Sequence, residues 1–354
     1  MTKALLPTGF RDRLPPEADA SARLVRSVLD TVASYGYERV QTPLAEYEAS
    51  LTAALGTSSR DLLRFVDPVS GETMAIRSDI TGQIGRIARG RMGHHPRPLR
   101  LSYGGPVVTL RATQLRPERE LMQVGAELIG LDSVAAVAEV VTVAIESLKG
   151  AGARDLTLDL TMPDLIDTLL PGADTADLKA RLDAKDAAAV PEAFRPLISA
   201  AGAYAEAAAR LRAFDEKGVL TARLDALDAL VALLPSDVRV TLDPTERHGF
   251  EYQSWFGFSL FSAQCSGEIA RGGSYRLGEE PAIGFSAYID PLIDAGLAQG
   301  ERRRLFLPLG TLTSKAAALR AEGWVTVAAL SDEDTAEAQI CSHILSNGRP
   351  VAID

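Results

Sequence analysis

The sequence predicts an α+β fold: an antiparallel sheet flanked by helices, with a helical insertion and a small C-terminal α/β unit. Three observations support this. Strand-like runs separated by turn residues follow one another through much of residues 62–129, as in successive hairpins. A stretch rich in alanine, leucine and charge, 163–235, is typical of helices. Residues 301–354 alternate strand-like and helix-like segments. We therefore expect a large domain over 1–300, which carries the insertion, and a small one over 301–354.

The N-terminal part begins with a helix. Proline is tolerated in the first turn, so the pair Pro15–Pro16 marks the start, and apolar residues at helical spacing continue to Gly36. Residues 37–43 (YERVQTP) follow as a strand, because tyrosine and valine favour an extended backbone. Strands over 62–66 and 72–77 enclose aspartate, proline, serine and glycine, which predicts a hairpin.

The next elements are one helix and three strands. Asp79 is expected to cap a helix over 79–90. Strand-like runs then cover 97–103, 107–111 and 120–129. This succession lacks the regular alternation of strand and helix that a parallel sheet requires, so the sheet is expected to be antiparallel.

The middle of the chain returns to helix and strand after these runs. Residues 133–148 predict a helix, since a capping serine, an apolar periodic run and a glycine follow in order. Residues 155–162 alternate polar and apolar side chains, as in a half-buried strand. Beyond the helical insertion, short strands are predicted at 238–242, 257–262 and 268–270.

The C-terminal segment has a composition of its own. The runs RRLFLPLG, WVTVAAL and RPVAI are strand-like, and residues 313–322 and 332–344 are helix-like. The order β-α-β-α-β predicts a small parallel α/β unit.

Composition limits the classes of function. The chain has 354 residues, 46% of them hydrophobic, and a net charge of −10. An acidic surface disfavours non-specific binding to nucleic acid or to anionic membranes, so neither is an expected partner. Two cysteines exclude a disulfide framework, and no run reaches the roughly 18 apolar residues of a membrane span. With no signal-peptide pattern at the N-terminus, we expect a cytoplasmic protein.

Common catalytic motifs are missing. We find no phosphate loop, no GxGxxG turn, no GxSxG elbow and no zinc-type spacing, so neither a cofactor nor a metal is expected. The adjacent His94 and His95 are interpreted as part of a surface turn. The stretch from Arg86 to Arg100 holds five arginines and no acid. It fits either an oxyanion partner or a solvated helix end, and the sequence does not separate the two.

Several ordered motifs resemble those of histidyl-tRNA synthetases. Residues 100–130, RLSYGGPVVTLRATQLRPERELMQVGAELIG, are similar to motif 2 without a gap. IRSDIT (76–81) is similar to the family's LRPEGT, and VQTPLAE (40–46) to motif 1, the dimer-forming strand. HGFEYQS (248–254) resembles RGLDYYT, and the segments ARGGSY and PAIGFSAYIDPL within 270–292 resemble GGRYDGL and motif 3. The resemblance implies a class II aminoacyl-tRNA synthetase-like sheet and a synthetase-type dimer.

The departures from the family fall on its catalytic positions. Motif 2 of an active synthetase carries an arginine that holds the ATP α-phosphate, and Thr109 stands there. The acidic position that helps hold adenine is Arg111, and His248 replaces the second catalytic arginine. Loss of two such charge contacts should cost several kcal/mol of transition-state stabilisation. The resemblance therefore implies a fold without aminoacylation and with no catalytic residues of its own. Thr109 also fits an ordinary strand threonine, which still leaves the arginine missing.

The amino-acid side of the family's pocket is retained in part. A carboxylate opposite an ammonium and polar groups around an imidazole are what a histidine ligand requires. Two alternatives stay open: the polar strand residues could form a buried network, and the tyrosines could be core aromatics. The residues that match the histidine-binding positions are Asp79, Thr81, Gln123, Glu127, Tyr252 and Tyr275.

A synthetase-like chain without its phosphate contacts resembles the family of ATP phosphoribosyltransferase regulatory subunits. That resemblance implies a partner, the short-form catalytic subunit, in a hetero-octamer, and a role in activity and histidine feedback in the first step of histidine biosynthesis. Histidine is a possible ligand of this chain or of the partner. Two alternatives are weighed: a divergent aminoacyl ligase, and a tRNA-binding module. The missing arginines count against the first, and the negative charge against the second.

Overall fold

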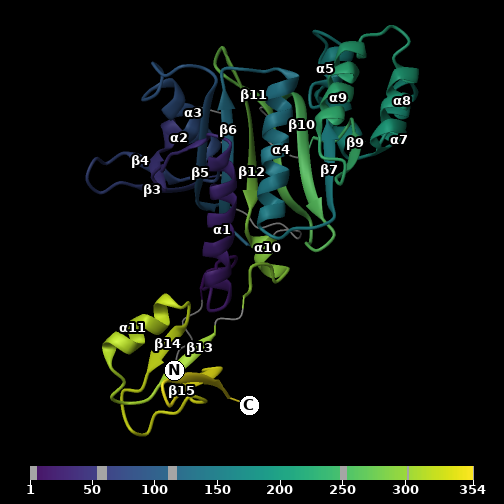
Figure 1. Cartoon of the computed structure of the whole chain (residues 1–354). Helices are drawn as coiled ribbons and strands as arrows, with labels where there is room; N and C mark the ends of the chain where they lie inside the picture. Colours follow the sequence, from purple (N-terminus) through teal and green to yellow (C-terminus); the bar gives the residue numbers. More distant parts are fainter. Residues whose placement is uncertain (1–5, 54–61, 111–117, 248–252, 301–302, 354) are drawn as a thin grey trace. The chain divides into compact units, whose positions relative to one another are not determined.

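The computed structural model describes residues 6–53, 62–110, 118–247, 253–300 and 303–353. The chain divides into two compact units, Met1–Ala298 and Gln299–Asp354 (Figure 1). Each unit is described by itself below.

The first unit is built on a nine-stranded mixed sheet in the order β1-β5-β6-β12-β11-β10-β7-β9-β8. The neighbouring pairs from β5 to β7 are antiparallel, as predicted, while β1 pairs with β5 and β7 with β9 in parallel. The α+β class is therefore confirmed. The strands are β1 (Glu38–Arg39), β5 (Leu99–Val108), β6 (Glu120–Ile129), β7 (Leu156–Thr161), β8 (Gly202–Ala203), β9 (Arg239–Asp243), β10 (Gln253–Ser262), β11 (Glu268–Leu277) and β12 (Glu280–Tyr288).

Helices α1 (Glu17–Ser34) and α4 (Val134–Gly150) lie side by side along one face of this sheet (Figure 1). Their apolar stripes bury residues such as Leu24, Val28 and Val141 in the main hydrophobic core. Each such side chain contributes about 1.5–3 kcal/mol relative to exposure. Ser133 caps α4 as predicted, because its hydroxyl accepts the backbone N–H of Ala136.

The opposite face carries a smaller apolar cluster and a three-stranded sheet of order β2-β4-β3. Ile84 of α3 packs in this cluster with Leu101 and Ile129 of the main sheet. The predicted hairpin is confirmed by the β3–β4 pairing. The elements on this side are β2 (Ala45–Tyr47), α2 (Glu48–Ala53), β3 (Leu63–Val66), β4 (Thr73–Ile76) and α3 (Thr81–Arg89).

Three of the predicted strands differ in extent from those observed. The strand expected over 37–43 is reduced to the two residues of β1. The strands expected over 97–103 and 107–111 form one strand, β5, which pairs with β6 along its whole length. Pro106 does not interrupt it, because β1 pairs only with Leu101 and Ser102, and an edge position tolerates a missing N–H. Strands β10 and β11 are also longer than predicted.

The segment from 163 to 235 is mainly helical and is joined to the sheet through β8 and β9. Its helices bury leucines against the main core, among them Leu182, Leu211 and Leu227. The helices are α5 (Leu165–Leu169), α6 (Ala176–Asp183), a 3-10 turn (Glu192–Phe194), α7 (Arg195–Ser199), α8 (Tyr204–Phe214) and α9 (Thr221–Leu233). A short α10 (Asp290–Asp294) follows β12.

The second unit is a four-stranded sheet of order β14-β13-β15-β16 with one described helix. Its elements are β13 (Arg304–Leu307), α11 (Thr313–Ala321), β14 (Val325–Ala328), β15 (His343–Ser346) and β16 (Arg349–Ala352). The first three match the predicted β-α-β start. Parallel pairing joins β13 to β14 and to β15, and β16 returns antiparallel.

The helix predicted over 332–344 is wrong. The segment forms turns instead, in which the Asp334 carboxylate accepts the backbone N–H groups of Leu330 and Ser331. A side chain that bonds nearby backbone in this way competes with helix formation. The chain then makes the hairpin β15–β16, and its turn residues Asn347 and Gly348 have φ values of 48° and 76°. The order of the unit is thus β-α-β-β-β.

Within the described ranges, no helix is long and apolar enough to cross a membrane. The same part of the chain holds no group of three or more histidine, cysteine or acidic side chains placed to hold a metal.

Candidate functional site

Five of the six residues predicted to line a histidine-like pocket come together beside α3. Asp79 precedes this helix and Thr81 begins it, Gln123 and Glu127 lie on β6, and Tyr275 lies on β11. Gln123 and Glu127 are four residues apart on one strand, so they share the same face of the sheet. The sixth, Tyr252, lies outside the described residues.

Asp79 forms the end of this group nearest α3. Its Oδ2 accepts a hydrogen bond from Gln123 Nε2 at 2.7 Å, and its Oδ1 accepts one from the backbone N–H of Thr81 at 2.7 Å. Asp79 is not the helix cap that we predicted: Ile80 occupies the cap position. Burial raises the pKa of the Asp79 carboxyl, against the opposing effect of the hydrogen bonds from Gln123 and Thr81.

Glu127 lies at the other end and is 1% exposed. Its Oε1 accepts the hydroxyl of Tyr103 at 3.1 Å, and its Oε2 accepts that of Tyr275 at 2.7 Å. Burial is the main cause that raises the pKa of the Glu127 carboxyl to about 8, and the charge of Asp79 adds to it. Gly284 of β12 makes room for this carboxylate, because a Cβ there would be 1.6 Å from Oε2.

Two further residues, which the sequence analysis did not select as site residues, connect these ends. The hydroxyls of Tyr103 on β5 and Ser286 on β12 are 2.9 Å apart. Ser286 Oγ accepts Nε2 of Gln123 at 2.7 Å, and Tyr103 contacts Thr81 Oγ1 at 3.2 Å. Both hydroxyl-bearing residues are 1% exposed. Tyr103 lies within the segment that resembles motif 2, so the alternation of side chains along β5 could have identified it. Ser286 could not be identified in this way, because only the pairing of β12 with β6 brings it to this group.

The arrangement is suited to a cationic ligand. Two carboxylates with raised pKa values, the buried Glu127 and the partly buried Asp79, lie in one hydrogen-bonded group, which a positive charge would stabilise. The hydroxyl of Tyr275 is used in this group, so the residue is more than a core aromatic. The side chains also form the buried polar network that was the alternative interpretation, and the two descriptions are compatible.

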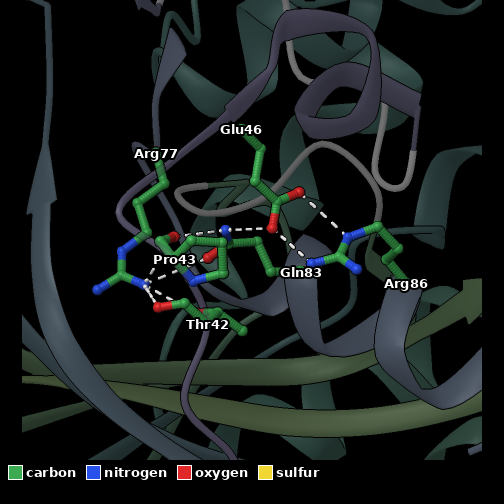
Figure 2. A network of polar contacts seen from close by, with 6 residues as sticks. All are labelled: Thr42, Pro43, Glu46, Arg77, Gln83 and Arg86. Atoms are coloured by element: carbon green, nitrogen blue, oxygen red, sulfur yellow. Dashed lines mark hydrogen bonds and ion pairs between the residues drawn. The ribbon is translucent and has the colours of Figure 1, made fainter. Parts of the chain in front are cut away.

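Arg77 belongs to a polar network that includes Thr42 and Gln83 (Figure 2). Arg77 is 4% exposed and directly follows β4. Its NH1 donates to Thr42 Oγ1 at 2.7 Å and to Gln83 Oε1 at 3.3 Å, and its Nε donates to the carbonyl of Pro106 at 2.8 Å. One guanidinium therefore joins the segment after β1, helix α3 and strand β5.

The network continues from Gln83 to an ion pair between Glu46 and Arg86. Gln83 Nε2 donates to Glu46 Oε1 at 2.8 Å, and Glu46 in turn binds Arg86 of α3 through both carboxylate oxygens (Figure 2). The amide of Gln83 thus lies between the guanidinium of Arg77 and the carboxylate of Glu46. The network holds the start of α3 in place. Asp79, just before this helix, and Thr81, its first residue, contact Gln123 and Tyr103 from there.

The positions predicted to replace the family's catalytic residues are described only in part. Thr109 follows β5, and its backbone N–H donates to the carbonyl of Arg119 at 2.7 Å. Arg119 returns a bond from Nε to the Thr109 carbonyl at 3.2 Å and stacks on Phe10, with Cζ 5.0 Å from the ring centre. Arg111 and His248 lie outside the described residues.

The arginine-rich stretch is tied to acidic side chains within the chain. Arg86 pairs with Glu46, and Arg100 pairs with Glu139 at 2.7 Å. Arg97 forms an ion pair with Glu280. Because three of its arginines are already matched by carboxylates, the stretch is a weak candidate for an oxyanion site.

Comparison of the whole chain with known proteins agrees with this geometry. The family model described as Histidyl-tRNA synthetase matches residues 9–292. A solved Bacillus halodurans protein titled ATP phosphoribosyltransferase regulatory subunit/histidyl-tRNA synthetase superposes with a TM-score of 0.81, at 23% identity and over 96% of each chain. Histidyl-tRNA synthetase from Nostoc superposes with a TM-score of 0.75, over 97% of this chain and 91% of that one, at 15% identity. The fold and the family match thus define a class II aminoacyl-tRNA synthetase-like protein.

Sequence relatives narrow the class. The ATP phosphoribosyltransferase regulatory subunit of Rhodospirillum centenum is 42% identical, with 98% of this chain and 95% of that protein covered. The proteins of the same name from Paramagnetospirillum magneticum and Gluconobacter oxydans are 41% and 36% identical, with 97% and 98% of this chain covered and 96% of each relative. The chain belongs to the family of ATP phosphoribosyltransferase regulatory subunits.

Proposed function

We propose that this chain is a non-catalytic subunit that assembles with the short-form catalytic subunit of ATP phosphoribosyltransferase, is needed for its activity and takes part in histidine feedback. The observation that carries the proposal is the 42% identity to a regulatory subunit over 98% of the chain. The threonine at position 109, where a synthetase needs a phosphate-binding arginine, supports a role without catalysis. We place the complex in the cytoplasm.

Assembly is tested by co-expression with the short-form catalytic subunit from the same genome. We expect a stable complex, which on the synthetase-like architecture is a hetero-octamer containing dimers of this chain. Phosphoribosyltransferase activity of the complex should exceed that of the catalytic subunit alone, and added histidine should lower it. Two proteins that do not associate at micromolar concentrations would contradict the proposal.

The absence of ligase chemistry is tested separately by histidine-dependent pyrophosphate–ATP exchange. Without the motif 2 arginine, charge that develops on the α-phosphate is not neutralised, so no exchange above background is expected. A histidyl-tRNA synthetase is the positive control. Robust exchange by this chain would favour a divergent aminoacyl ligase instead.

The pocket is the proposed place for histidine on this subunit. Asp79 would bind the ammonium group, and Gln123, Glu127, Tyr275 and Thr81 would surround the remainder, with Tyr252 as a further proposed contact. Both carboxylates lie in one hydrogen-bonded group. Isothermal titration calorimetry with L-histidine, on the chain alone and in the complex, tests this; Asp79→Ala should weaken binding by at least about tenfold, because a buried cation loses its partner.

A further inference from the structure

The hydroxyl of Tyr103 is surrounded by four oxygen atoms. It lies 3.1 Å from Glu127 Oε1, 3.4 Å from the carbonyl oxygen of Phe285, 2.9 Å from Ser286 Oγ and 3.2 Å from Thr81 Oγ1. A phenol has one proton to donate. Two of the four neighbours, Glu127 and Phe285, offer alternative acceptors for that proton, while the serine and threonine hydroxyls can donate to the phenol oxygen.

The other hydrogen-bond partner of Ser286, the amide of Gln123, determines whether its hydroxyl donates to Tyr103 or accepts from it. Gln123 Oε1 accepts the backbone N–H of Ile80 at 3.0 Å, so its Nε2 is the end that points to Asp79 and Ser286. Ser286 Oγ accepts from this amide and can therefore donate to Tyr103. A continuous hydrogen-bonded path thus leads from the carboxylate of Asp79 through Gln123, Ser286 and Tyr103 to that of Glu127.

We propose that Tyr103 is a two-position hydrogen-bond switch that accommodates Glu127 in either protonation state, so that binding of a cationic ligand in this pocket is coupled to release of a proton from Glu127. In the unliganded state the protonated Oε1 of Glu127 donates to the Tyr103 oxygen, and the Tyr103 hydroxyl donates to the Phe285 carbonyl. When the cation binds, the Glu127 O–H bond breaks and the proton passes to solvent. The Tyr103 hydroxyl then turns to donate to Oε1 of the carboxylate.

The surroundings of Glu127 support the coupling. Among the titratable groups of the described elements, Tyr103 on β5 and Tyr275 on β11 donate to it, while Asp79 before α3 and Tyr37 before β1 interact with it through charge. Both tyrosines have pKa values well above the usual range because of burial, so they remain proton donors at neutral pH. Arg271 on β11 acts on Asp79 and counters part of the effect of burial there. A ligand cation therefore meets a carboxyl group, that of Glu127, which can still lose a proton.

The switch itself is tested on the unliganded full chain by carbon-13 NMR of the glutamate carboxyl groups, with Glu127→Gln used to assign the signal. We expect Glu127 to titrate near pH 8, far above the exposed glutamates. Tyr103→Phe removes a charge-assisted donor from the ionised form and a weaker neutral acceptor from the protonated form, so the midpoint should rise by about one unit. Tyr204→Phe is the matched control, because Tyr204 of α8 is also buried and donates to a carboxylate, that of Asp228, at 2.5 Å in the segment 163–235. The control should leave the midpoint unchanged.

The coupling is tested by calorimetry of L-histidine binding to the complex in phosphate and in Tris buffer, and this part rests on the proposed function. At pH 7 we expect release of about one proton from the protein per bound ligand, after correction for the titration of free histidine, and less release above pH 9.

The outcomes separate the switch from the coupling. Titration of Glu127 near 4.5, or an unchanged midpoint in Tyr103→Phe, would overturn the switch whether or not histidine binds. Binding without proton release, or no binding to a complex that assembles, would overturn the coupling. A complex that never assembles would count against the proposed function instead.

Discussion

At the scale of single residues, Glu127 gives the pocket a pH dependence of stability. Its ordinary pKa is near 4.5, and in the folded chain the pKa is about 8. Between these values the unfolded chain has lost the proton and the folded chain retains it. A raised carboxyl pKa therefore makes folding less favourable as pH rises through this window, and the loss is complete above the folded value.

A glutamine at this position should remove that dependence. We expect the free energy of unfolding of the native chain, measured relative to Glu127→Gln, to fall between pH 5 and 8 with a limiting slope of about 1.4 kcal/mol per pH unit. Urea denaturation at four or five pH values measures it, and the difference between the two chains cancels most other titrating groups. A constant difference over this range would show that Glu127 is ionised throughout.

Gly284 is a second residue with a direct consequence. An added Cβ would lie 1.6 Å from Glu127 Oε2 and 2.7 Å from the Ala126 carbonyl, and two tyrosines hold the Glu127 carboxylate in place. We expect Gly284→Ala to destabilise the fold by about 1–3 kcal/mol through overpacking, measured by urea denaturation. Gly300→Ala is the control, since a Cβ there meets nothing within 4 Å. Equal stability of the two variants would mean that β12 moves away from β6 at little cost.

At the scale of elements, Arg77 joins three parts of the chain that are far apart in sequence. Its guanidinium binds the backbone or side chains of Thr42, Gln83 and Pro106. Removing it leaves buried acceptors without donors, and each such loss costs about 1–3 kcal/mol.

We expect Arg77→Ala to lower the free energy of unfolding by about 3 kcal/mol and to speed amide exchange in residues 42–46 and in the first turn of α3. Denaturation and hydrogen-exchange mass spectrometry measure the two effects. Arg26→Ala is the matched control, because its ion pair with Asp30 is exposed and should change stability by less than about 0.5 kcal/mol. Faster exchange spread evenly over the whole sheet would contradict a local role.

The elements that could be predicted from the sequence are those with strong local signals. The helix after Ser133 was correct because a cap, a periodic run and a glycine agree. Strand β5 was divided in two because its glycines and proline indicate a break, whereas pairing with β6 keeps it extended. In the C-terminal unit, Asn347–Gly348 is a hairpin signal that was overlooked, and the acidic turn before it was mistaken for a helix.

At the scale of the whole molecule, the net charge of −10 bears on nucleic-acid binding. Contacts to phosphate are made mainly by lysine and arginine, and acidic residues outnumber these in this chain. We expect no retention of tRNA in a filter-binding titration at 0.1 M salt up to about 10 µM protein, with a histidyl-tRNA synthetase as the positive control. Saturable, salt-dependent retention would indicate a cationic surface formed despite the overall charge.

The fold class, and most members of the hydrogen-bonded group around Gln123 and Glu127, could be predicted from the sequence because the motifs occur in the order of a known family. The hydrogen-bonded path could not. Tyr103 and Ser286 are 183 residues apart, and only the register of β5, β6 and β12 brings their hydroxyls together. Likewise, the need for glycine at position 284 is explained only by the structure, which places the Glu127 carboxylate where a Cβ would lie.

The distance in sequence between these residues determines which gene segment must be transferred to keep the group complete. The pocket draws on residues from Asp79 to Ser286, which come from both sides of the segment 163–235. A gene fragment that ends before the codon of Ser286 therefore lacks part of this group. We expect an exchange between paralogues to preserve the proposed ligand binding only when residues 79–286 are transferred together, because the segment 163–235 also supplies leucines to the main core.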